Sequence, residues 1–435
     1  MRKRGAGIEA PASGHLGALI VLALLLAVHL AALWSLGPEY TLNSDDLSYI
    51  KSGIRFAQTG TITMHTEYPS AQIMPGMTVL IAAVYRLVGD GAALWIVLKC
   101  LWALMGVLTA WFVYRCVRVF APGWCGVLAM LPLFRADFLW MDSLILTETP
   151  FMLALTAMVY CTLMMWKRPG WRYFWGAAAC YMAALMLKAN IALYPLFALA
   201  FLLAQGYDRR RLFRQCVVLA CVVLCFVVPW SIRNYAQFHA FIPLTYGAGN
   251  PTLLGTYQGV GYPSDEELDY ETNVDRVVEE RCARYYGADG EVEPRFQKYV
   301  SLERDGVKAA YRQRAWAEKD LPGMLYSYLV LKPKMMIFSS FYWERVFDIS
   351  GRWMFLLQKI DAVLCVLAAA LSLCRKRWRK PVLFLSALYL GNLYIYAMTF
   401  AFDRYNASLM SLRFILIGIG LGLAAELFRE RTAAE

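Results

Sequence analysis

Two adjacent carboxylates, Asp45 and Asp46, follow directly on an apolar run over residues 16–36. Burying a carboxylate beside hydrocarbon is costly unless the group is solvated, paired or used in chemistry, so this position suggests a functional site. A structural explanation competes with it, because aspartates at the start of a surface helix through Ile50 would stabilise the free N–H groups of that helix. The local sequence leaves both interpretations open.

Four further polar groups lie at the ends of apolar runs. They are the acidic stretch Asp137, Asp142 and Glu148; Lys188 with Asn190; Arg233-Asn234-Tyr235; and Asp403-Arg404-Tyr405. Each also has a structural explanation, because a single base reaches lipid head groups, an acid pairs with the base beside it, and an acid at a helix start caps the helix. Charges of both signs on one membrane face nevertheless favour a site for an anionic, lipid-borne substrate.

The sequence lacks the common catalytic motifs of soluble enzymes. It contains no Walker loop, no HExxH motif, no paired CxxC and no Ser-His-Asp order. Nearly all of the 11 cysteines lie within or beside apolar segments, so no disulfide framework is predicted. His65 is one of four histidines and is predicted to be a surface loop residue.

The composition is that of a polytopic membrane protein. Of the 435 residues 59% are hydrophobic, and the mean hydropathy is +0.45. The formal net charge of +11 comes from bases clustered in short loops between apolar runs, which a positive-inside topology explains. Membrane lipids are therefore the expected partners, and nucleic acid is not.

The elements that must position these residues are predicted to be helices of an all-α bundle with roughly 10–12 transmembrane segments and juxtamembrane loops on its outer face. Apolar segments of spanning length, or close to it, cover residues 16–36, 73–88, 92–114, 124–134, 143–165, 173–187, 191–204, 213–230, 353–373, 382–401 and 409–427. The segment 325–342 carries two lysines and a proline and is predicted to lie on the outer surface as an amphipathic helix.

Basic loops predict the orientation of these segments. The clusters Arg2 to Arg4, Lys167-Arg168, Arg209 to Arg214 and Arg375 to Lys380 are expected in the cytoplasm, which places Asp45 and Asp46 outside. Counting back from Lys167 places Asp137, Asp142 and Glu148 outside as well. Either 73–88 or 124–134 therefore does not cross, or the two acidic sites are unrelated, and the sequence does not decide between these alternatives.

Three regions follow from this topology. Residues 1–230 form an N-terminal transmembrane catalytic module with a first outer loop at 37–72. Residues 231–324 form an outer, periplasmic region whose weak apolar periodicity does not predict an independent domain. Residues 325–435 contain the surface helix and the C-terminal transmembrane helices.

The order of the motifs resembles that of the polytopic GT-C-fold glycosyltransferases, a bacterial, glycosyltransferase family 39-like branch similar to protein O-mannosyltransferases and lipid A aminoarabinose transferase. The matching residues are Asp45-Asp46 with Tyr49, Gly60, Pro69 to Pro75-Gly76, Leu146-Thr147-Glu148, Leu185 to Lys188, Pro229-Trp230 with Arg233-Asn234-Tyr235, Phe241-Ile242-Pro243, Gly247 to Asn250, and Arg404-Tyr405. The family often has Asp-Glu where this chain has Asp45-Asp46.

The resemblance implies inverting transfer of a sugar from a polyprenyl-phosphate carrier, such as undecaprenyl phosphate, to a lipid, glycan or protein acceptor. It also implies a bacterial inner membrane location with the active site facing the periplasm or exterior. No cofactor is certain, although a divalent cation, Mg or Mn, is possible. The resemblance implies that Asp45 is the base and that Asp46 and Glu148 orient substrate or bind that metal. It implies that donor phosphate is bound by Lys188, Arg233 and Arg404. The residues implied to contact substrate are Tyr49, Asn234, Tyr235 and Tyr405.

Two other functions fit part of the pattern. A polysaccharide polymerase or ligase acting on carrier-pyrophosphate oligosaccharides would gather the same charges on the outer face. A secondary transporter would have a similar number of crossings, but its ionisable residues belong at mid-membrane in broken, repeated helices. The acidic residues here lie at segment ends, which favours the transferase.

Overall fold

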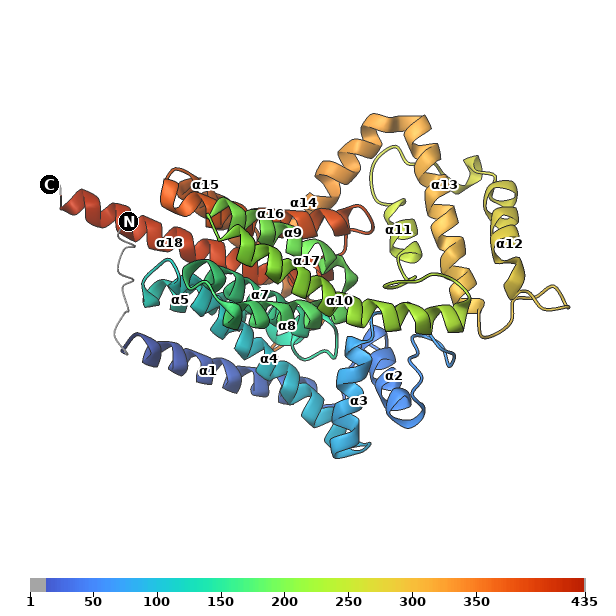
Figure 1. The fold of residues 1–435 in the computed structure, drawn as a ribbon, viewed down its shortest axis with the longest axis horizontal. Coiled ribbons are helices and arrows are strands. Elements are labelled where there is room, and N and C mark those ends of the chain that lie inside the picture. The colour runs from blue at the N-terminus through green and yellow to red at the C-terminus, as the bar shows by residue number, and fades with distance from the viewer. Residues whose placement is uncertain (1–12, 434–435) are drawn as a thin grey trace.

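The computed structural model describes residues 13–433, and within them the regular structure is helical (Figure 1). The helices form an elongated bundle, from one end of which a smaller group of helices projects. The expected basic cluster Arg2 to Arg4 lies outside the described residues. The prediction of an all-α polytopic membrane protein is confirmed.

Six of the described helices are long and apolar enough to cross a membrane. They are α1 (Ser13–Leu36), α4 (Ala92–Arg118), α7 (Glu148–Lys167), α10 (Arg209–Phe238), α15 (Gly351–Leu373) and α18 (Met410–Thr432). The remaining bundle helices are shorter or more charged: α3 (Gly76–Val88), α5 (Gly123–Met130), α8 (Trp171–Leu187), α9 (Tyr194–Ala204) and α16 (Lys376–Ala397). A total of 10–12 crossings therefore stays a prediction.

Helix α7 lies at the centre of the bundle and packs against α4, α8 and α18. Of the residues in its most apolar stretch, 78% are buried. Small residues let neighbouring helices approach closely, as in other membrane bundles. Gly420 of α18 lies against Ala368 of α15, where an added Cβ would come within 2.4 Å of the alanine Cβ. Helix α10 lies at the edge of the bundle, since only 11% of the residues in its most apolar stretch are buried and the rest are free to face lipid.

The outer region has a hydrophobic cluster of its own, which the weak periodicity of the sequence did not predict. Helices α11 (Gly249–Gly255), α12 (Arg276–Cys282) and α13 (Gln297–Tyr326) lie at the right of Figure 1. Buried aromatic residues such as Phe238, Tyr285 and Phe296 form the cluster, together with Ile62 and Ala71 from the loop after α2. The region is thus packed onto the first outer loop.

Residues 325–338 are helical, as the sequence suggested, but they do not form one regular α-helix. Helix α13 breaks at Asp320, whose φ of −153° and ψ of 75° are not helical, and a π-helix at Ser327–Leu331 leads into α14 (Lys332–Phe338). Lys332 is wholly buried and donates to the Thr399 carbonyl at 3.1 Å, whereas Leu325, Leu329 and Val330 are about half exposed, so one side of this segment packs on the protein and the other is open.

Two short helices complete the end of the bundle that faces the outer region. Helix α2 (Asp45–Thr59) packs on α3, and α17 (Asp403–Ala407) contacts α7, α14 and α16. Together with the start of α7 and the end of α8, they bring the charged residues of the sequence into one place.

Candidate active site

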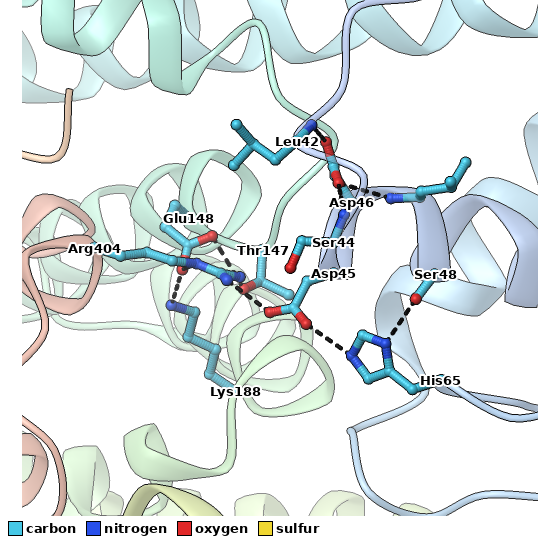
Figure 2. Close-up of polar contacts among 11 residues, drawn as sticks. Leu42, Ser44, Asp45, Asp46, Ser48, His65, Thr147, Glu148, Lys188 and Arg404 are labelled. Carbon is cyan, nitrogen blue, oxygen red and sulfur yellow. Dashed lines mark hydrogen bonds and ion pairs between the residues drawn. The ribbon is translucent and has the colours of Figure 1, made fainter. Parts of the chain in front are cut away.

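Four charged residues from distant parts of the chain form one connected group (Figure 2). Arg404 Nη1 donates to Asp45 Oδ2 at 2.6 Å, and Arg404 Nε donates to Glu148 Oε1 at 2.7 Å. Lys188 Nζ donates to the same Glu148 oxygen at 2.7 Å. The structure therefore brings together four of the residues that the sequence singled out: two acids and two bases.

Glu148 is the central member of this group and is fully buried. It is the first residue of α7, where the helix dipole favours an acid. A buried carboxylate is tolerated only when paired and hydrogen-bonded, and Lys188 and Arg404 supply both conditions. Lys188 reaches it because α8 ends at Leu187 and Lys188 itself is extended, with φ −144° and ψ 122°.

Asp45 is held ionised by its neighbours. Partial burial raises the pKa of this carboxyl, but the hydrogen bond with His65 and the charge of Arg404 outweigh burial and keep the pKa well below its usual range. At neutral pH the group is therefore an anion beside the cavity.

Asp46 is turned the other way. Its carboxylate accepts hydrogen bonds from three backbone N–H groups, those of Leu42 at 2.6 Å, Ser44 at 3.1 Å and Leu47 at 2.9 Å. Figure 2 shows it directed away from Arg404. These contacts hold the turn into α2, which is the structural explanation that the sequence left open for this aspartate.

The charged group lines a cavity of about 460 Å³, within the usual range for a small-molecule site. Tyr396 and Tyr405 form an aromatic wall, with stacked rings whose centroids are 4.4 Å apart. Lys188 Nζ lies 5.9 and 5.8 Å from these two centroids. Tyr49 and Asn190 line the same cavity.

The triplet Arg233, Asn234 and Tyr235 does not line this cavity. Arg233 Nη1 donates to the Ser70 carbonyl at 2.9 Å, Asn234 is buried and donates to the Ile242 carbonyl at 2.8 Å, and Tyr235 is 59% exposed. The first two residues fix the outer loop and the outer region instead.

Asp45, Asp46 and Glu148 do not fit a shared divalent cation. Both carboxylate oxygens of Asp46 accept hydrogen bonds from backbone N–H groups. Arg404 binds Oδ2 of Asp45 and Oε1 of Glu148. Over residues 13–433 no group of three His, Cys, Asp or Glu side chains is arranged to hold a metal.

Sequence reasoning missed two residues of the site. Tyr396 lies inside an apolar run, where an aromatic residue is expected in any helix core. His65 is an exposed loop residue, as predicted, but the sequence did not predict that its Nε2 lies 2.9 Å from Asp45 Oδ1. Neither has a local sequence signal, because both contacts depend on how distant segments pack.

Residues 72–232 match the model of the dolichyl-phosphate-mannose-protein mannosyltransferase family. No curated protein sequence matches the chain.

Several solved structures share the fold. The oligosaccharyltransferase AglB of Archaeoglobus fulgidus, in complex with an inhibitory peptide and a dolichol-phosphate, aligns with 96% of this chain at a TM-score of 0.55 and 14% identity. The same enzyme with zinc and sulfate aligns with 95% of the chain, at 0.53 and 16%. The alignments cover 52% and 50% of AglB, so this chain spans about half its length. ArnT of Cupriavidus metallidurans, bound to undecaprenyl phosphate, aligns over 95% of this chain and 79% of its own, with 15% identity and a TM-score of 0.44.

These findings confirm the resemblance that the motifs predicted. The chain is an all-α polytopic membrane protein with a GT-C-like fold, and its segment 72–232 is similar to the dolichyl-phosphate-mannose-protein mannosyltransferases.

Proposed function

We propose that this protein is an inverting glycosyltransferase that moves a sugar from a polyprenyl-phosphate carrier to an acceptor hydroxyl. One observation carries the proposal: Lys188, Arg404 and Asp45, which suit the phosphate and the proton of this reaction, line one cavity at the bundle end. The family match and the shared fold support the same donor class.

The two cations suit the donor phosphate. The carrier phosphate gains negative charge as the sugar leaves, and fixed cations stabilise that charge. Lys188 and Arg404 are both bound to Glu148, so their spacing is set before the donor arrives. Because a phosphate leaves as a stable anion, no strong general acid is required.

The rest of the cavity suits a sugar. Aromatic faces pack against the apolar C–H surface of a pyranose ring, and Tyr396 with Tyr405 offers such a wall. Asn190 lines the cavity, and its Oδ1 atom is buried with no hydrogen-bond partner among the described residues. A buried acceptor without a partner is costly, and a sugar hydroxyl would satisfy it.

Asp45 is the proposed general base. The acceptor oxygen forms a bond to the anomeric carbon as the bond from that carbon to the phosphate oxygen breaks, and the electron pair leaves with the phosphate. The hydroxyl proton passes to Asp45 as it becomes acidic in the transition state. A single displacement of this kind inverts the anomeric configuration.

The site is proposed to face the periplasm or exterior of a bacterial inner membrane. Glu148 and Lys167 are the two ends of α7, a helix of 20 residues, and at about 1.5 Å per residue such a helix spans the hydrocarbon core. Lys167-Arg168 belongs to the basic loops expected in the cytoplasm, so Glu148 lies on the opposite side.

A panel of polyprenyl-phosphate sugars, incubated with the purified protein and a crude acceptor fraction, tests this proposal. Release of free polyprenyl phosphate from one donor is the expected result. If the folded protein consumes none of them but consumes a carrier-pyrophosphate oligosaccharide, the polymerase or ligase alternative is correct and the transferase proposal is wrong.

A further inference from the structure

His65 is placed against the proposed base by both of its ring nitrogens. Its Nε2 lies 2.9 Å from Asp45 Oδ1, and its Nδ1 lies 2.9 Å from Ser48 Oγ (Figure 2). Asp45 and Ser48 are both in the first turn of α2, whereas His65 comes from the loop between α2 and α3. The loop thus folds back over the helix start.

The loop that carries His65 is held in place by several contacts. His65 has a φ of +53°, in the left-handed region that non-glycine residues seldom adopt without support. The Ser70 N–H donates to the Ile62 carbonyl at 2.8 Å, and the Ser70 hydroxyl lies 3.0 Å from the Tyr246 hydroxyl. Arg233 binds the Ser70 carbonyl from α10. The outer region thus holds the loop at Ser70, while Met64, next to His65, is buried in the hydrophobic cluster of the bundle.

The partners of His65 determine its hydrogen-bonding pattern when the ring is neutral. An ionised carboxylate only accepts hydrogen bonds, so Nε2 must donate to Asp45. Nδ1 is then the acceptor, and the Ser48 hydroxyl donates to it. Ser48 thereby stabilises the tautomer that binds the base.

The bond with His65 restricts how Asp45 meets Arg404. An arginine and a carboxylate prefer a two-pronged pair in which both oxygens are bound. Here Arg404 Nη1 donates to Oδ2 of Asp45, while Arg404 Nε donates to Glu148. Oδ1 of Asp45 is hydrogen-bonded to His65. Without His65, Asp45 is free to rotate toward Arg404 and direct both oxygens away from the acceptor.

We propose that His65 is a positioning residue for the glycosyl transfer: it fixes the carboxylate of Asp45 so that one oxygen stays directed at the acceptor hydroxyl, and Ser48 fixes the tautomer of His65. This inference rests on the proposed function. His65 itself exchanges no proton with substrate.

The kinetic test compares His65→Ala with the conservative variant His65→Gln, whose amide N–H can donate to Asp45. His65→Ala is expected to lower kcat about 10- to 100-fold, the cost of a misplaced catalytic group, with the donor KM changed less than about twofold. His65→Gln is expected to recover most of kcat, and Ser48→Ala to give an intermediate loss. His239→Ala is the control, because its side chain is exposed at the end of α10.

Two kinetic results would overturn the inference: an unchanged kcat in His65→Ala, or equal losses in His65→Ala and His65→Gln. A second measurement does not depend on turnover. In ¹⁵N-histidine NMR of the detergent-solubilised protein, one of the four histidines is expected to show the Nε2–H tautomer and to change in both Asp45→Asn and Ser48→Ala. If no histidine responds to either substitution, the inference fails whether or not a donor is known. Absence of donor turnover with the NMR response intact would count against the proposed function alone.

Discussion

At the scale of single residues, two adjacent aspartates perform different tasks. Side chains of consecutive helical residues point in different directions, so Asp45 and Asp46 cannot share one partner set. Asp45 contacts Arg404 and His65 at the cavity, whereas Asp46 accepts backbone N–H groups behind it. From the sequence, both were expected at the site, Asp45 as the base and Asp46 to orient substrate or bind a metal.

Replacing Asp46 by alanine is expected to affect stability more than catalysis. The substitution leaves backbone donors of the turn without their acceptor, which costs about 1–3 kcal/mol. A lower thermal midpoint in detergent, with kcat of the folded fraction within a few-fold of wild type, is the predicted outcome. A folded Asp46→Ala protein of wild-type stability that has lost turnover would assign the chemistry to Asp46 instead.

The low pKa of Asp45 predicts how stability depends on pH. The folded pKa is below the unfolded value of about 3.9, so the stabilisation is fully present above that value and is lost as pH falls through the folded pKa. Arg404→Gln removes one cause of the shift, so the thermal midpoint of this variant is expected to fall less between pH 5 and pH 3 than that of wild type. Equal falls in both proteins would show that Arg404 does not depress this pKa.

At the scale of elements, two cations that look alike in the sequence belong to different structures. Lys188 lies at the end of α8 and lines the cavity, while Arg233 lies on α10 and binds the Ser70 carbonyl of the outer loop. The first is proposed to bind donor phosphate, and the second holds the loop.

Lys188→Gln and Arg233→Gln are therefore expected to differ in kind. Lys188→Gln should raise the donor Kd about tenfold or more, because a cation facing a phosphate is lost. Arg233→Gln should change the donor Kd less than threefold and instead make the loop around Ser70 easier to cleave with protease. The reverse pattern, measured by donor binding and limited proteolysis, would place Arg233 at the phosphate.

Helix α3 approaches α8 through Gly76, the glycine of the Pro75-Gly76 motif. A Cβ at this position would lie 2.5 Å from the Met186 carbonyl oxygen, two residues before Lys188. Gly76→Ala is therefore expected to push α3 from α8, lowering the thermal midpoint and weakening donor binding. Gly17→Ala is the matched control, because no atom lies within 4 Å of its added Cβ. A Gly76→Ala protein as stable as Gly17→Ala would show that the approach is not tight.

At the scale of the whole molecule, the site lies between two hydrophobic clusters. The bundle supplies Glu148, Lys188 and Arg404, while the outer cluster holds the loop that brings His65 to Asp45. In Figure 1, α18 ends at the far end of the bundle from α11, α12 and α13. The charged cavity therefore belongs to the end of the bundle that the outer region covers.

The sequence predicted the parts of this molecule that depend on composition and local pattern. Apolar length predicted a polytopic helical bundle, and acids and bases at segment ends predicted Asp45, Glu148, Lys188 and Arg404. Contacts between separate segments could not be predicted from it, because no local pattern marks His65 or Tyr396. The hydrophobic cluster of the outer region was missed for a similar reason. Its aromatic residues come from short helices and loops, which share no regular spacing of apolar residues.

The proposed function requires Asp45 for transfer from a polyprenyl-phosphate sugar. The most direct measurement is release of polyprenyl phosphate by purified wild type and Asp45→Asn, with the best donor of the panel and an acceptor fraction. A neutral amide cannot accept the proton, so turnover is predicted to fall about 100- to 10,000-fold in Asp45→Asn while donor binding remains within a few-fold. Turnover by Asp45→Asn near the wild-type rate would contradict the account.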